Sequence, residues 1–110
     1  MSIELYAAYL KERENTELIC VDSGFITYRF ELDYCYIIDI YILPEMRKNG
    51  LGVELENRVI EQARERKVFK LLGSVDRTAN NWETSIKILE KIGYKPYKQD
   101  KSVLFLIKEI

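Results

Sequence analysis

The spacing of apolar residues divides the chain into helical and strand-like stretches. Near the start, apolar residues recur at helical spacing, and Ser2 can cap the helix that this pattern predicts through about Arg13. Apolar side chains at every fourth position predict a second, amphipathic helix from Leu51 to about Arg66. A third amphipathic pattern, at 82–92, ends before Gly93, which is a suitable helix C-cap.

Strand-like runs fill most of the remaining chain. They cover residues 16–21, 24–31, 34–43, 69–75, 94–99 and 102–108. The short gaps between the first three runs predict an antiparallel meander. The run 34–43 is nearly continuous in β-branched and aromatic residues, which is typical of a central strand covered on both faces, and Pro44 ends it. The order α-β-β-β-α-β-α-β-β predicts an α/β (α+β) fold, a mixed sheet with helices packed on its faces.

Length and composition indicate one soluble domain spanning residues 1–110. The chain is 47% hydrophobic and 32% charged, and no apolar run approaches the ~20 residues that a membrane helix needs. The N-terminus shows no basic and apolar secretion signal, so we expect a cytoplasmic protein with no membrane partner, whose Cys20 and Cys35 remain thiols.

Charge and the missing histidine exclude several classes of function. Lys and Arg total 17 against 18 Asp and Glu, so no strong positive field draws the protein to nucleic acid. With no histidine in the chain, Ser-His-Asp, Cys-His and His-metal sites are excluded, and we expect no metal cofactor. Proton transfer must use Asp, Glu, Tyr, Lys, Cys or water.

A glycine-rich turn links the third strand-like run to the helix that begins at Leu51. Gly50 and Gly52 would let an anion approach free N–H groups at the helix N-terminus, with Arg47 and Lys48 adding positive charge. A Walker A loop would need Lys-Ser/Thr after the last glycine, and a dinucleotide fingerprint would need a third glycine. The two glycines alone are equally compatible with a simple turn.

The wider sequence resembles a known family. Residues 39–52, Asp-Ile-Tyr-Ile-Leu-Pro-Glu-Met-Arg-Lys-Asn-Gly-Leu-Gly, look like motif A of the GNAT acetyltransferases, which is Gln/Arg-x-x-Gly-x-Gly/Ala after a strand ending in apolar-x-Pro-Glu. Residues 81–94 are similar to the family's second helix with its terminal Gly-Phe/Tyr. The resemblance covers roughly residues 16–108 and implies the GNAT fold, a mixed sheet splayed at the acetyl-CoA site between the strands containing Ile40 and Leu72.

The same resemblance implies acetyl-CoA as donor and roles for individual residues. Main-chain groups of Ile40, Tyr41 and Ile42 would hold the pantetheine arm, with the Ile42 amide directed at the carbonyl oxygen. The pyrophosphate would lie in the loop made by Arg47, Lys48, Asn49, Gly50, Leu51, Gly52 and Val53. Asn81 and Ser85 would lie near the other side of the cofactor.

Catalytic residues are less well defined by the pattern. Leu89 occupies the position where many members of the family carry a tyrosine that protonates the departing thiolate. Other hydroxyl groups are therefore candidates, and Tyr41 and Tyr94 are the first to test. Asp39 interrupts an apolar strand and is our first candidate for the base; a structural aspartate, paired with a lysine or a backbone N–H, is the equal alternative. Only one helix precedes the strands, so the acceptor site is either open or completed by a partner subunit, for example in a homodimer.

These observations support three hypotheses. The first is acetyl transfer from acetyl-CoA to a primary amine, by direct attack in a ternary complex. The second is an acyl-CoA-binding module that has lost turnover, and the third is a purely structural domain. Acidic residues early in the chain would favour a cationic acceptor such as a polyamine or a protein lysine, although a solvated surface explains them as well: Glu12, Glu14, Glu17, Glu31 and Asp33.

Overall fold

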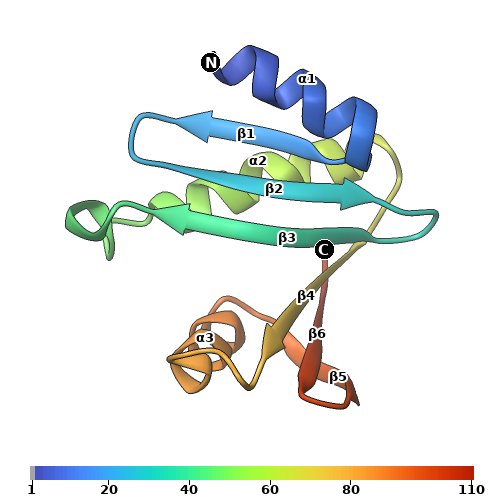
Figure 1. The fold of residues 1–110 in the computed structure, drawn as a ribbon. Coiled ribbons are helices and arrows are strands. Elements are labelled where there is room, and N and C mark those ends of the chain that lie inside the picture. Colours follow the sequence, from blue (N-terminus) through green and yellow to red (C-terminus); the bar gives the residue numbers. More distant parts are fainter. Residues whose placement is uncertain (1) are drawn as a thin grey trace.

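The computed structural model describes residues 2–110 as one mixed sheet with helices on both faces (Figure 1). The element order matches the α-β-β-β-α-β-α-β-β prediction, with a short 3₁₀ turn, η1, added after the third strand. The elements are α1 (Ile3–Glu14), β1 (Glu17–Val21), β2 (Gly24–Phe30), β3 (Cys35–Ile42), η1 (Pro44–Met46), α2 (Leu51–Glu65), β4 (Lys70–Asp76), α3 (Trp82–Lys91), β5 (Lys95–Asp100) and β6 (Val103–Glu109).

The six strands lie in the order β1-β2-β3-β4-β6-β5. All neighbouring pairs are antiparallel except β3 and β4, which run parallel. This parallel contact is also the shortest, because only Cys35 with Leu71 and Tyr36 with Leu72 are register partners. Beyond these residues the two strands diverge, as Figure 1 shows.

The main core lies between the sheet and α2. Leu55, Val59 and Ala63 of α2 are fully buried against central strand residues that include Ile26 and Leu71. Leu89 of α3 is partly buried on the same core and lies against Gly73 of β4. The helix α1 lies over the opposite face of the sheet, above β1–β3.

The start of α1 is capped as the sequence predicted. Ser2 Oγ accepts a hydrogen bond of 3.1 Å from the Leu5 amide, which satisfies one of the free donors of the first turn. The apolar face of α1 is less buried than its pattern suggested, because Leu10 is the only buried residue of this helix while Ile3 and Tyr6 remain exposed. The helix therefore covers the sheet loosely.

One expectation about β3 is wrong. The strand lies centrally in the sheet, but its second half is not covered on both faces, since Asp39, Ile40 and Tyr41 are exposed. The cause is the divergence of β4, which leaves this half of β3 with a neighbouring strand on one side only. Within residues 2–110 no helix has the length and apolar character needed to cross a membrane.

Candidate active site

The divergence of β3 and β4 opens a gap lined by main-chain groups that no strand pairs. Leu43 N–H donates to the Ser23 carbonyl at 2.8 Å, and the Tyr41 carbonyl oxygen lies close to Gly24, so both face β2. Main-chain groups alternate in direction along a strand. The N–H and C=O groups of Ile40 and Ile42 therefore point toward β4, where no strand pairs with them.

The Gly50 turn presents a second set of free donors at one end of this gap. Gly50 caps α2 with φ 80° and ψ 4°, a left-handed conformation that favours glycine, and no side chain caps the helix. Glu54 N–H bonds to the Gly50 carbonyl at 3.0 Å, and the structure records no hydrogen bond for the amides of residues 51–53. These amides and the positive end of the helix dipole form a site suited to an anion.

The surface above this turn is open. A Cβ atom at Gly50 would meet no heavy atom within 4 Å, and one at Gly52 would meet only Ile40 Cδ1, at 3.7 Å. Arg47 folds back over the end of β3, donating from Nε to the Ile42 carbonyl at 2.9 Å with its guanidinium 5.6 Å from the centre of the Tyr41 ring. Free amides, open space and a nearby cation fit a diphosphate group.

The start of α3 lies at the same edge of the sheet as the start of α2. Both helices follow the carboxyl ends of the parallel strands β3 and β4, which is where ligands bind in many α/β folds. Asn81 caps α3 in a left-handed conformation, with φ 61°, and its side chain makes no capping bond. Ser85 Oγ donates to the Asn81 carbonyl at 3.4 Å, and both residues are exposed.

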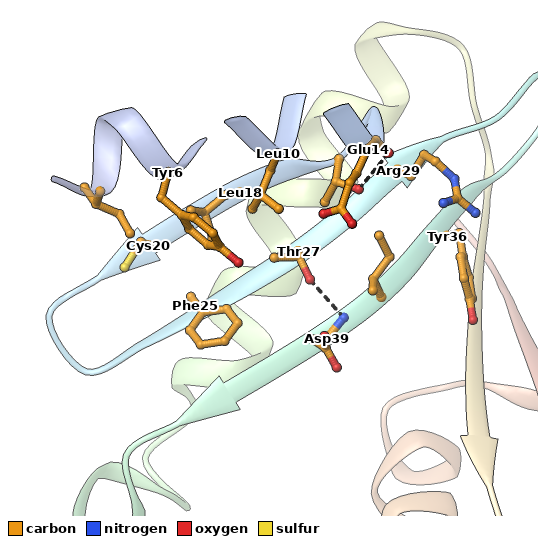
Figure 2. A pocket seen from close by; sticks show the side chains of 13 residues that line it. Tyr6, Leu10, Glu14, Leu18, Cys20, Phe25, Thr27, Arg29, Tyr36 and Asp39 are labelled. Carbon is orange, nitrogen blue, oxygen red and sulfur yellow. Dashed lines mark hydrogen bonds between the residues drawn. The ribbon is translucent and has the colours of Figure 1, made fainter. Parts of the chain in front are cut away.

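A cavity of about 500 Å³ lies on the other face of the sheet, between α1 and strands β1–β3 (Figure 2). Asp39 lies at its edge, and its amide donates to Thr27 Oγ1 at 3.1 Å. No salt bridge involves the Asp39 carboxylate among the residues that the structure describes. Within residues 2–110 the structure thus records neither the lysine nor the backbone N–H that the structural alternative would pair with Asp39.

Comparison with known proteins identifies the family. The model of the acetyltransferase (GNAT) family matches residues 3–94. The chain belongs to the GNAT acetyltransferase family. This membership confirms the resemblance of residues 39–52 and 81–94, and it agrees with a sheet that opens between β3 and β4.

Solved GNAT structures share this fold at low sequence identity. The PaiA N-acetyltransferase from Thermoplasma acidophilum in complex with coenzyme A is 15% identical, with a TM-score of 0.75 over 100% of this chain and 80% of that one. A GNAT acetyltransferase from Elizabethkingia anophelis with acetyl-CoA bound is 17% identical, with a TM-score of 0.72 over 99% and 84%. The ribosomal-protein-S18-alanine N-acetyltransferase from Escherichia coli is 19% identical, with a TM-score of 0.67 over 100% and 77%. A search of curated proteins finds no match.

The two tyrosines chosen from the sequence lie in different environments in this GNAT chain. Tyr94 is 3% exposed, and burial together with the nearby Glu56 carboxylate raises the pKa of its hydroxyl far above the usual range. We therefore assign Tyr94 to the core. Tyr41 is exposed, and its ring lies 6.1 Å from that of Phe25. Since its carbonyl faces β2, Tyr41 offers the gap no main-chain carbonyl.

Tyr36 is a further tyrosine beside the gap, and the sequence pattern did not single it out. Its hydroxyl and that of Ser74 are 2.6 Å apart, so the pair bridges β3 and β4 just where they begin to diverge. Tyr36 also lines the cavity under α1. A strand tyrosine gives no sign of this role until its partner strand is known. Leu89, by contrast, packs on the core as expected and supplies no acid.

Proposed function

We propose that this chain transfers an acetyl group from acetyl-CoA to a primary amine by direct attack in a ternary complex. The observation that carries the proposal is the gap beside β3, a strand that leads into the cradle of free amides at the start of α2 and carries Asp39 in the lining of the cavity under α1. The donor supplies an activated thioester. A chain that binds it at this gap and admits an amine from the α1 side brings the two reactants together without covalent catalysis.

On this proposal, most of the binding falls to main-chain groups. The amides of Leu51, Gly52 and Val53 bind the pyrophosphate, helped by the Gly50 turn. The positive charge comes from Lys48 and Arg47, and Asn49 completes the loop. The main-chain groups of Ile40 and the Ile42 amide, which no strand pairs, hold the pantetheine arm in strand-like pairing. Asn81 and Ser85, at the start of α3, border the donor from the β4 side.

The proton steps use few residues. The amine nitrogen forms a bond to the acetyl carbon while the carbon–sulfur bond breaks. The proton that the amine loses goes to Asp39, directly or through water. The departing thiolate takes a proton from water, and the hydroxide that this leaves is neutralised when Asp39 releases its proton. The Ile42 amide, which points into the gap, stabilises negative charge on the acetyl oxygen. Tyr36 and Ser74 provide a hydroxyl pair beside this path.

A binding module without turnover is the second candidate. It is favoured by the absence of a hydroxyl at Leu89 and by the burial of Tyr94. A positioned acid is worth ~100- to 10,000-fold in rate, so its loss slows transfer strongly without excluding it, because a thiolate is a good leaving group.

Two measurements separate these functions. Calorimetry with acetyl-CoA tests the cradle, and thiol release with a panel of primary amines tests transfer, with an amine-free sample as the control for hydrolysis. We expect binding and amine-dependent thiol release. Binding with no release across the panel would favour the module, and no binding at millimolar concentration would refute both functions.

A further inference from the structure

The cavity under α1 has the size and walls of a small-molecule site. Its volume of about 500 Å³ falls within the ~300–1,000 Å³ typical of ligand pockets. It is bounded by α1 on one side and by β1, β2 and β3 on the other, and it reaches Asp39, our candidate base (Figure 2). An amine bound here would therefore lie beside the gap through which it must react. The walls are largely apolar: Ile3, Leu10, Leu18, Phe25 and Ile38.

The charged side chains of the lining leave two carboxylates without a partner. Arg29, the one cation among the described residues of the lining, donates from Nε to Glu31 Oε1 at 2.6 Å and lies 5.6 Å from the centre of the Tyr36 ring. Its charge is thus compensated by Glu31. The other charged groups are Glu14 and Asp39, and neither takes part in a salt bridge within residues 2–110.

These two carboxylates come from opposite walls. Glu14 is the last residue of α1, and Asp39 lies on β3; Figure 2 shows both beside the cavity, with the Tyr6 hydroxyl also directed into it. The C-terminal end of a helix carries a partial negative charge, so Glu14 adds its carboxylate to an end that already repels anions. A cation placed near Glu14 would be attracted by both.

We propose that the acceptor is an aliphatic diamine or polyamine, bound with its reacting nitrogen at Asp39 and a second, protonated nitrogen at Glu14. The apolar walls between them would hold the methylene spacer. A monoamine with an apolar body would fill the same space but would leave Glu14 unpaired. This inference rests on the proposed acetyl transfer, because it names the acceptor of the same site.

The test compares two amines of similar length and shape. With acetyl-CoA in excess, 1,4-diaminobutane should show a lower KM than n-pentylamine. A series of diamines with longer spacers should then show which spacer length gives the lowest KM. Glu14→Gln should raise the KM for the diamine about fivefold, as expected for a single exposed ion pair, and leave that for n-pentylamine unchanged. Added salt should raise the KM for the diamine and leave the KM for n-pentylamine unchanged.

Glu12→Gln is the matched control, because Glu12 is an acidic residue of α1 that does not line this cavity. It should leave both KM values as they are. Equal KM values for the two amines, an equal effect of Glu12→Gln and Glu14→Gln, or turnover of lysine peptides with none of diamines would overturn the inference. Each of these results would leave the acetyl transfer itself standing. Acetyl-CoA binding without turnover of any amine would refute the proposed function, and the inference with it.

Discussion

Gly24, at the start of β2, offers a direct test of how closely β3 is held. Gly24 is the register partner of Ile42. A Cβ atom added at Gly24 would lie 2.5 Å from the Tyr41 carbonyl oxygen and 2.7 Å from Ile42 Cδ1. The Ile42 side chain can rotate away, but the Tyr41 carbonyl belongs to the main chain and can move only with the strand.

The size of the effect follows from these distances. To restore an ordinary contact of 3.4 Å, the Tyr41 carbonyl must move about 0.9 Å from its 2.5 Å position. Overpacking of this kind costs ~1–3 kcal/mol of stability. A shift of ~1 Å in a catalytic group costs ~100-fold in rate, and the Ile42 amide must follow the Tyr41 carbonyl because the two belong to one peptide unit.

We therefore expect Gly24→Ala to lower kcat about 100-fold and to weaken acetyl-CoA binding much less, since the Gly50 turn proposed for the pyrophosphate lies beyond the end of β3. Steady-state thiol release and calorimetry measure the two quantities, and thermal unfolding reports the stability cost. Gly73→Ala is the folding control, because its Cβ would meet nothing closer than 3.8 Å. If Gly24→Ala kept full activity and stability, the strand would not hold the Ile42 amide rigidly, and its assigned role would be wrong.

Four further predictions concern the donor cradle, the base, the thiols and pH. Gly52→Val should weaken acetyl-CoA binding about tenfold or more in calorimetry, yet fold normally, because outside its own helix the one described atom within 4 Å of a Cβ there is Ile40 Cδ1, at 3.7 Å; unchanged affinity would contradict the cradle. Asp39→Asn should reduce kcat ~100-fold or more with acetyl-CoA affinity intact, and a fully active variant would remove Asp39 as the base. A thiol reagent should label exposed Cys20 in the folded protein and reach Cys35 only after unfolding, because Cys35 is buried and burial raises its pKa to about 12; rapid labelling of both would show that the core opens. Burial also raises the pKa of the Tyr28 hydroxyl to about 12. The Tyr28 hydroxyl and the Cys35 thiol therefore lose their protons at lower pH in the unfolded chain than in the folded chain, and stability in chemical denaturation should fall as pH rises from about 9 to about 12.

The sequence predicts the elements well because their signals are local. Ser2, Pro44 and Gly93 mark boundaries that depend only on neighbouring residues. In the structure Ser2 caps the start of α1, while Pro44 and Gly93 follow closely on the ends of β3 and α3. The glycine-rich turn could be found in the same way. What the sequence does not reveal is pairing between distant segments, such as the hydroxyl contact between Tyr36 and Ser74.

Burial was the other quantity that local patterns misjudged. The apolar residues of α1 suggested a packed face, but a single helix covers this side of β1–β3, and its contacts leave a cavity rather than a filled core. Tyr94 was chosen for its hydroxyl, whereas its position between α2 and β4, near Glu56 and Gly73, buries that group. Both outcomes depend on which elements lie above a residue, which spacing along the chain does not specify.

A β-bulge in β3 explains how one strand can serve both faces of the sheet. Thr27 pairs with Asp39 while Tyr28 pairs with Ile37, so Ile38 is an extra residue in the ladder. Tyr28, the partner of Ile37, is buried in the core on the α2 side, so the Ile37 side chain also faces α2. If side chains alternated strictly after Ile37, the Asp39 side chain would face α2 as well. The extra residue instead turns Asp39 toward the cavity under α1. It also leaves Ile40 and Ile42 with side chains toward α2 and main-chain groups toward the gap. A single inserted residue thereby separates the proposed base from the proposed donor contacts and places them on the two sides from which the reactants would arrive.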